Sequence, residues 1–138
     1  MKEYLKNVRL PGQTVNPLFA YLGVTVEEIS AQRVVLRLPF RPGFIQGGGM
    51  IAGGIIATLA DEAMAHAALA ALNPGETTAT IEMNIRYLNA CPSGAITATA
   101  SLVKKGRRIM TLQAEIADAS RQAIAQAGAS FMVLSKKS

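Results

Sequence analysis

A run of glycines and the helix predicted after it are the part of this sequence best suited to chemistry. Gly47-Gly48-Gly49 precedes a segment from Met50 to Leu72 that is rich in Ala and Leu and free of proline. The first turn of a helix carries N–H groups without helical partners and the positive end of the helix dipole, and glycine leaves room for a ligand there. Such a helix start can stabilise negative charge developing on a carbonyl oxygen, as an oxyanion hole does.

Asp61 is an acid within this otherwise apolar segment, eight residues beyond Gly53. An ionised carboxylate in apolar surroundings is costly unless it is paired, hydrated or used in a reaction. The structural alternative is a solvated helix face shared with Glu62. Eight helical residues span about 12 Å, so Gly53 and Asp61 of one chain cannot both contact one small reacting group. Two antiparallel copies of the helix would bring Asp61 of one chain beside the helix start of the other.

The glycine run also matches other patterns. Gly47 to Ala52 fits the Gly-x-Gly-x-x-Ala variant of a dinucleotide fingerprint, but that motif requires a preceding strand, and Arg41-Pro42-Gly43-Phe44 is a poor one. No Lys-Ser/Thr pair follows the glycines, which argues against a phosphate-binding P-loop. Flexible entry into the helix, or close packing of its start against a sheet, remains open as the purely structural interpretation.

The remaining reactive residue types favour structural roles. His66, the single histidine, lies about 140° around the helix from Asp61, which predicts a core or interface position. Cys91, the single cysteine, is predicted to be a small apolar filler. One histidine and one cysteine cannot supply a Cys/His metal site, so no metal is expected. No serine occupies a Gly-x-Ser-x-Gly elbow, so nothing supports a serine hydrolase.

Length and composition predict one compact domain over residues 1–138, with residues 1–14 as a loosely ordered leader. Half of the residues are hydrophobic, and the net charge of +5 comes from scattered basic residues, so no nucleic-acid partner is expected. The most apolar stretch meets Asp61 well before membrane-spanning length, and no signal peptide is evident. With one cysteine and no internal disulfide, we expect a cytoplasmic protein without a membrane partner.

The segment 50–72 is apolar on all sides, which is typical of a buried helix. Asn16-Pro17 predicts a short helix that stops at Gly23, and residues 24–38 predict a hairpin with its turn near Ser30. After the long helix, four strands joined by short turns are predicted to be antiparallel neighbours: Thr78–Asn89, Ala95–Val103, Arg108–Ala117 and Gln122–Leu134.

These elements predict an α+β fold in which a curved antiparallel sheet wraps around one long central helix, with a short helix near the N-terminus. A sheet of this length cannot cover the helix on all sides and leaves strand edges free. Free edges favour pairing with a second copy, so at least a homodimer is expected.

Two segments then resemble a known family. The runs from Gln46 to Asp61 and from Thr80 to Leu88 resemble the hotdog-fold acyl-CoA thioesterases of the phenylacetate-degradation type. The family pattern is an Asn or Gln, a Gly-x-x-His-Gly-Gly element, a helical Asp or Glu, and a strand with an Asn-x-x-Tyr/Phe element. The resemblance covers most of the chain.

The resemblance implies a role for each matching position. Gly53 would polarise the thioester carbonyl through its N–H, with Gly54 as a substrate-binding neighbour. Asp61 would act as general base or nucleophile from the opposite subunit, and Gln46 would orient water or thioester. Thr80 lies near the strand hydroxyl that helps to hold the attacking water in some members.

The implied reaction is hydrolysis of an aryl- or fatty-acyl-CoA thioester at a homodimer interface, in a dimer of dimers. No cofactor is expected, since coenzyme A is part of the substrate. The best basic cluster for its phosphates lies at one turn, although solvated turn charges are an equal interpretation: Lys104, Lys105, Arg107 and Arg108.

One position departs from the family pattern, because Ala52 replaces the histidine of His-Gly-Gly. That histidine is usually assigned a supporting role, so its loss bears on rate and substrate range more than on reaction class. The departure also leaves a second hypothesis, a non-catalytic protein that binds an acyl-CoA or acyl-carrier thioester in the same cleft.

Overall fold

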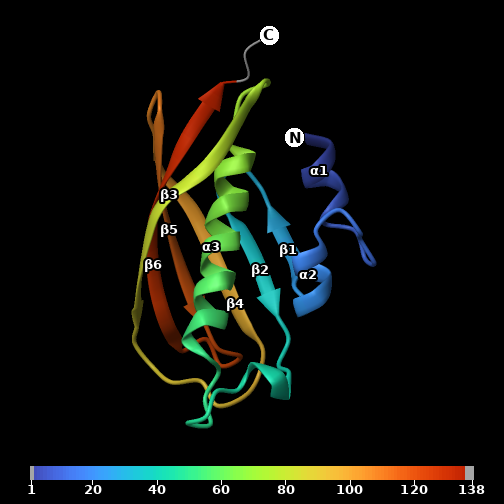
Figure 1. The fold of residues 1–138 in the computed structure, drawn as a ribbon, viewed down its shortest axis with the longest axis vertical. Helices are drawn as coiled ribbons and strands as arrows, with labels where there is room; N and C mark the ends of the chain where they lie inside the picture. Colours follow the sequence, from blue (N-terminus) through green and yellow to red (C-terminus); the bar gives the residue numbers. More distant parts are fainter. Residues whose placement is uncertain (1, 136–138) are drawn as a thin grey trace.

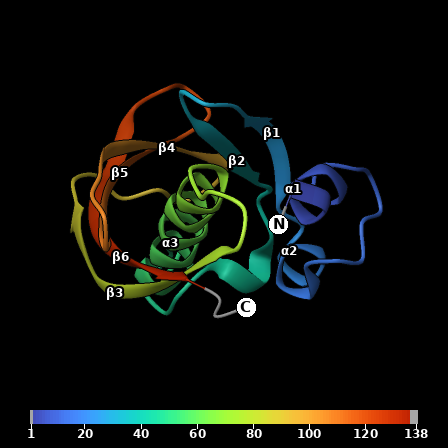
Figure 2. The same cartoon turned by 90° about the horizontal axis from the view of Figure 1, so that it is seen from above.

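A six-stranded antiparallel sheet wraps around one long helix in residues 2–135, the part of the chain that the computed structural model describes (Figures 1 and 2). The elements are α1 (Lys2–Asn7), α2 (Pro17–Leu22), β1 (Thr25–Ile29), β2 (Val34–Leu38), the 3-10 helix η1 (Pro42–Phe44), α3 (Gly53–Ala70), β3 (Glu76–Tyr87), β4 (Ile96–Lys105), β5 (Ile109–Ala117) and β6 (Ala123–Ser135). Two short helices lie beside β1, the edge strand at the other end of the sheet from β3 (Figure 2). The predicted α+β architecture is confirmed.

The strands lie in the order β1-β2-β4-β5-β6-β3, and every neighbouring pair is antiparallel. The turns predicted to join β4 to β5 and β5 to β6 do connect neighbours. The prediction was wrong for β3 and β4: β3 pairs only with β6, at the edge of the sheet, and residues 88–95 carry the chain across to β4. A short linker containing proline and glycine permits either a hairpin or a crossing, so its composition does not decide between them.

Helix α3 forms the centre of the hydrophobic core. Its predicted start at Met50 was too early, because Ile51 pairs with Ile45 in an isolated bridge and Ala52 is extended, with φ −61° and ψ 137°. Small side chains allow the strands to approach the helix closely. The buried residues of α3 are Ile56, Leu59, Ala60, Ala63, Met64, His66, Ala67 and Ala68.

One side of α3 is not fully covered by the rest of the chain. The residues along it recur every three or four positions and therefore share a face. We call this face the open stripe; Gly54 is exposed, and the other members are partly exposed: Ala57, Thr58, Asp61 and Ala65. The expectation that the sheet cannot cover the helix on all sides is confirmed.

The N-terminal segment is folded where the structure describes it, so the expectation of a loosely ordered leader was wrong. Residues Lys2–Asn7 form α1, and Val8 is only 3% exposed. The Tyr4 hydroxyl lies 2.8 Å from Nε2 of His66 on α3. The contacts that order this segment come from a helix some 60 residues away in the chain, and the local polar composition does not reveal them.

Truncating Val8 tests this anchoring. We expect Val8→Ala to lower the free energy of unfolding by about 1–3 kcal/mol, because it leaves a cavity in a buried contact. Leu10→Ala is the matched control, since Leu10 is 55% exposed and should change stability by no more than about 0.5 kcal/mol. Urea denaturation of both variants measures the difference. Equal effects of the two substitutions would show that residues 2–8 are not anchored.

Candidate active site

The start of α3 presents backbone N–H groups without acceptors. The N–H of Ile51 donates to the Cys91 carbonyl (2.8 Å), and the N–H of Ala52 donates to the Phe44 carbonyl (2.9 Å). Ala52 is the N-cap and has no side chain to bond the following N–H groups. Within residues 2–135, the N–H groups of Gly53 and Gly54 therefore find no hydrogen-bond acceptor. Because α3 is 18 residues long, its dipole adds positive potential at this point.

Tyr87, at the end of β3, closes over Gly53. Its hydroxyl donates to the Gly53 carbonyl (2.7 Å), and a Cβ added at Gly53 would lie only 3.2 Å from the Tyr87 ring. Close packing against Tyr87 therefore favours glycine here, besides any role of its N–H. A Cβ at Gly54 would meet nothing within 4 Å, so the second position is open. Sequence reasoning assigned no role to Tyr87, although the Asn-x-x-Tyr element that ends at it was a usable signal.

Asp61 is half-buried on the open stripe. Its Oδ1 is shielded from solvent and has no hydrogen-bond partner in the described part of the chain. Burial raises the pKa of the Asp61 carboxyl above its ordinary value. A carboxylate that is partly desolvated and unpaired is a stronger base than one in water. The interpretation of Asp61 as part of a fully solvated helix face is therefore not supported.

The structure does not bring Asp61 and Gly53 together within one chain. Both lie on α3, eight residues apart, which corresponds to about 12 Å along the helix axis. Strand β3 lies at the edge of the sheet and pairs with β6 on one side. Its other edge is free in the described chain.

Thr80 lies on the helix side of β3. A bulge separates the pairs Thr80↔Phe131 and Glu82↔Ser130 and leaves Ile81 as the extra residue. Residues directly opposite each other share a face, and Phe131 is buried, so Thr80 faces the same side. Ile81 is accordingly 48% exposed.

Gln46 is exposed in the loop before α3, with its side chain turned into its own loop. Its Oε1 accepts from the Gly48 N–H, and its backbone N–H donates to the Met50 carbonyl (2.8 Å). In this arrangement the amide holds the glycine loop together rather than pointing at a substrate.

The basic turn between β4 and β5 lies at the opposite end of α3 from Gly53. Nζ of Lys105 donates to the Ala71 carbonyl (2.9 Å) and to Oε1 of Glu76 (3.1 Å), so Lys105 helps to cap the C-terminal end of the helix. An 18-residue helix is about 27 Å long, so one chain does not bring this turn to its own glycine loop. The other basic residues of the cluster are exposed: Lys104, Arg107 and Arg108.

His66 and Cys91 have the structural roles predicted for them. His66 is 2% exposed, and its ring packs against Phe19 with 5.0 Å between ring centroids. Cys91 is 3% exposed, and burial raises the pKa of its thiol, which makes it a poor nucleophile.

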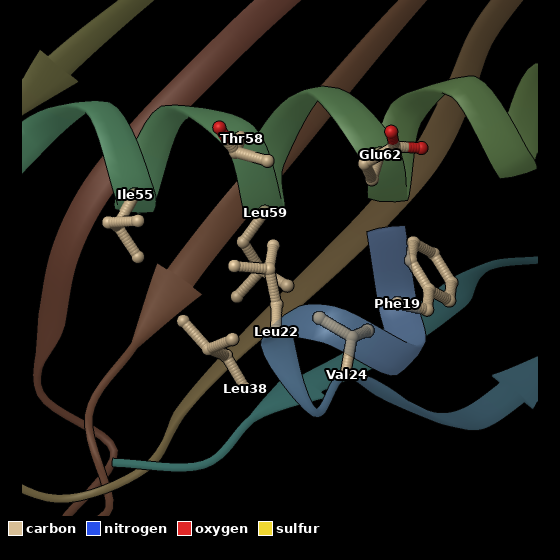
Figure 3. Close-up of a pocket in the computed structure, with 8 residues that line it drawn as sticks. All are labelled: Phe19, Leu22, Val24, Leu38, Ile55, Thr58, Leu59 and Glu62. Atoms are coloured by element: carbon tan, nitrogen blue, oxygen red, sulfur yellow. The ribbon is translucent and has the colours of Figure 1, made fainter. Parts of the chain in front are cut away.

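An apolar seam runs between α2 and α3 (Figure 3). Leu22 and Leu38 meet Ile55 and Leu59 there, and the space between them is too narrow to hold a water molecule. The stem of Glu62 lines one end of the seam, while its carboxylate points away from the leucines. The seam therefore anchors α2 to the helix that carries Asp61.

Among residues 2–135, no three histidine, cysteine or acidic side chains are grouped so that they could hold a metal ion. No helix in that range combines the length and the apolar character that crossing a membrane requires.

Replacing the Asp61 carboxyl should stabilise the fold at neutral pH. Since burial raises the pKa of Asp61 in the folded state, the folded protein binds more protons than the unfolded chain, and stability falls as pH rises through that pKa. Asp61→Asn should therefore raise Tm at pH 7, and the gain should shrink below the pKa of the unfolded chain, at about pH 3.5. Thermal denaturation at both pH values measures this. A neutral-pH Tm at or below that of the unmodified protein would contradict it.

Glu115→Gln is the control for that comparison, because Glu115 is exposed on the outer face of β5. Its removal changes the net charge by the same amount without relieving a buried carboxylate. We expect no comparable gain in Tm from this change.

The chain is similar to proteins of one family. The family model named thioesterase superfamily matches residues 48–125. A candidate esterase of Halobacterium salinarum is 34% identical over 127 residues, which cover 84% of this chain and 83% of that protein. The 1,4-dihydroxy-2-naphthoyl-CoA hydrolase of Listeria monocytogenes is 22% identical over 116 residues, covering 84% and 94% of the two chains.

Solved structures show the same architecture. A thioesterase family protein of Silicibacter pomeroyi superposes with a TM-score of 0.85 and 27% identity, covering 96% of this chain and 98% of that one. A phenylacetic acid degradation-related protein of Ralstonia eutropha gives a TM-score of 0.84 with 21% identity, over 94% and 98% of the chains. The hotdog fold expected from the sequence is confirmed. The match over residues 48–125, which include the start of α3 and Asp61, shows that the chain belongs to the thioesterase superfamily and is a hydrolase of thioesters.

Proposed function

We propose that this protein hydrolyses an aryl- or fatty-acyl-CoA thioester to a free acid and coenzyme A, at a site shared between two subunits. The observation that carries the proposal is the pair of groups on α3: acceptor-free N–H groups at Gly53 and Gly54, and a half-buried acid at Asp61. The name of the Listeria monocytogenes relative, an aryl-CoA hydrolase, supports the choice of substrate class. Since coenzyme A is part of the substrate, the proposal includes no separate cofactor.

Stabilisation of the carbonyl oxygen is assigned to the start of α3. As the tetrahedral intermediate forms, negative charge develops on the former thioester oxygen, and the Gly53 N–H donates to it. A preorganised donor of this kind lowers the barrier by on the order of 3 kcal/mol. The Tyr87 hydrogen bond to the Gly53 carbonyl holds the peptide at the helix start, so that the donor does not need to reorient during the reaction.

Asp61 of the other subunit is assigned to the attacking group. As general base, its carboxylate takes a proton from water while the water oxygen bonds to the carbonyl carbon. The C–S bond then breaks, and the thiolate of coenzyme A takes up the proton from Asp61. As nucleophile, the Asp61 carboxylate would instead attack the carbonyl carbon, and the C–S bond would break to release the thiolate of coenzyme A and leave a mixed anhydride. Water would then hydrolyse the anhydride, which releases the free acid, restores the Asp61 carboxylate and supplies the proton for the thiolate. Both routes use the same two subunits and the same donor.

Three observations support a site composed of two subunits. Gly53 and Asp61 of one chain are about 12 Å apart, Oδ1 of Asp61 lacks a partner, and β3 has a free edge. Exposed apolar side chains lie along and just after that strand: Ile81, Tyr87 and Leu88. A long apolar strand edge is a natural pairing surface, and a two-fold pair would create two equivalent sites. We therefore propose a homodimer, with two dimers forming a tetramer.

The two-fold pair also gives the basic turn a role. In one chain this turn lies at the far end of α3, but an antiparallel second helix would place its own C-terminal end near the first helix start. Lys104, Arg107 and Arg108 of the second copy would then face the coenzyme A phosphates. Lys105 is already bound to Glu76 and Ala71, so we assign it to the helix end.

Gln46 and Thr80 are assigned to the placement of water or of the thioester. For Gln46 this requires its side-chain amide to break the hydrogen bond with the Gly48 N–H. The cytoplasm is the proposed location.

The reaction is tested with a panel of aryl- and fatty-acyl-CoA thioesters, following free thiol with Ellman's reagent. On the best substrate, we expect Asp61→Asn to lower kcat by about 10²- to 10⁴-fold with little change in KM. The Glu115→Gln control should retain full activity. Ala52→His restores the family residue and should raise or broaden activity.

Two results would contradict the proposal. Saturable binding across the panel without thiol release would indicate a thioester-binding protein instead. An Asp61→Asn protein as fast as the unmodified one would remove Asp61 from the reaction and leave Gly53 as a packing glycine.

A further inference from the structure

Two peptide units at the start of α3 carry the free N–H donors. The N–H of a residue and the carbonyl of the residue before it belong to one peptide unit, so a hydrogen bond to that carbonyl polarises that N–H. The Gly53 N–H shares its unit with the Ala52 carbonyl, and the Gly54 N–H shares its unit with the Gly53 carbonyl. The strength of the two donors therefore depends on the groups that bind these two carbonyls.

The two carbonyls are bound in different ways. The Ala52 carbonyl accepts from within the helix, from the N–H groups of Ile55 (3.0 Å) and Ile56 (3.2 Å). The Gly53 carbonyl accepts from outside the helix, because the Tyr87 hydroxyl donates to it (2.7 Å). Tyr87 is thus a side chain that acts directly on the peptide unit of the free Gly54 N–H.

The sheet holds the Tyr87 hydroxyl in place. Tyr87 pairs with Ala125 on β6, and the N–H of the next residue, Leu88, donates to the Ile124 carbonyl (2.9 Å). The Tyr87 ring lies against Gly53, at 3.2 Å from an added Cβ. A side chain fixed at its backbone, ring and hydroxyl keeps its hydrogen bond aligned, as preorganised stabilisation of charge requires.

The Gly54 N–H lies where a ligand can reach it. Gly54 is exposed on the open stripe, and a Cβ there would meet nothing within 4 Å. The N–H groups of the first turn of a helix point outward along its axis, so neighbouring donors can converge on one oxygen.

Thr58 provides an internal comparison. Its hydroxyl donates to the Gly54 carbonyl (2.9 Å), which is the same kind of bond as the one that Tyr87 makes. The N–H of that peptide unit belongs to Ile55, however, and it already donates to the Ala52 carbonyl. Thr58 therefore acts on an occupied donor, whereas Tyr87 acts on a free one.

We propose that the Gly54 N–H is a second donor to the thioester oxygen, beside that of Gly53, and that Tyr87 is a positioning residue that orients and polarises this second donor. Both N–H groups donate to the oxygen as negative charge develops on it. Tyr87 does not touch the substrate and transfers no proton. The inference rests on the proposed function for its effect on rate, but the effect of Tyr87 on the Gly54 amide does not require turnover.

Tyr87→Phe tests the effect on rate, because it removes the hydroxyl and keeps the ring over Gly53. On the best substrate of the acyl-CoA panel, we expect kcat to fall about 3- to 10-fold with little change in KM, since the weakened donor is used mainly in the transition state. Tyr21→Phe is the matched control. Tyr21 is 78% exposed on α2, and loss of its hydroxyl should leave kcat unchanged.

NMR of ¹⁵N-labelled protein measures the polarisation without substrate. Gly54→Ala, which has room for the added Cβ, identifies the Gly54 signal by its loss. In Tyr87→Phe, the ¹⁵N signal of Gly54 should move to higher field, because the carbonyl of its peptide unit loses a hydrogen bond. Thr58→Val is the comparison, and it should move the Ile55 signal while leaving that of Gly54 in place.

The outcomes separate this inference from the proposed function. An unmoved Gly54 signal in Tyr87→Phe would overturn the inference, and so would a kcat equal to that of Tyr21→Phe. A raised KM with unchanged kcat would also overturn it, since Tyr87 would then serve substrate binding alone. If the unmodified protein releases no thiol from any thioester of the panel, the proposed function fails and the donor role of Gly54 fails with it. A moved Gly54 signal would in that case still uphold the effect of Tyr87 on the amide.

Discussion

Two uncompensated groups on one helix govern the rest of this structure. Helix α3 begins with N–H donors that have no acceptor, and two turns later it carries a half-buried carboxylate with an orphaned oxygen. The half-buried carboxylate costs folding free energy, because a desolvated carboxylate without a partner is less stable than one in water. A serine, threonine or aspartate N-cap would bond the free N–H groups and stabilise the helix start, but its side chain would occupy the donors. Ala52 leaves them free.

The neighbouring elements hold this helix start in place while leaving its donors available. The carbonyls of Phe44 and Cys91 bind the two N–H groups that precede Gly53, and the Tyr87 hydroxyl binds the Gly53 carbonyl. The linker that crosses from β3 to β4 thus supplies a hydrogen bond to the helix start, through the Cys91 carbonyl. On the opposite side of α3, Tyr4 and His66 tie the N-terminal segment to the helix. Rigid support of this kind is what a preorganised oxyanion site requires.

Local patterns predicted the elements well, because the apolar periodicities and the Asn16-Pro17 helix start are local signals. The features that the sequence did not reveal are those that contacts between residues far apart in the chain determine. The pairing of β3 with β6, the folding of residues 2–8 onto α3 and the bulge at Ile81 depend on partners far along the chain. The same distinction between local and distant signals applies to the candidate site. Glycine spacing and the helical acid identified Gly53 and Asp61, whereas the position of the basic turn at the far end of α3 required the three-dimensional arrangement.

The central claim, that Gly53 and Asp61 act across two subunits, is tested most directly by mixing two inactive variants. Asp61→Asn removes the acid, and Gly53→Pro removes the N–H. Ala52 already has the extended backbone that a residue before proline adopts, and the added ring has to displace the Tyr87 side chain, 3.2 Å from a Cβ at position 53. If the site is shared, subunit exchange in an equal mixture creates mixed dimers with one intact site, and thiol release should recover to about a quarter of the unmodified activity. A mixture that stays at the sum of its two inactive components would contradict the account.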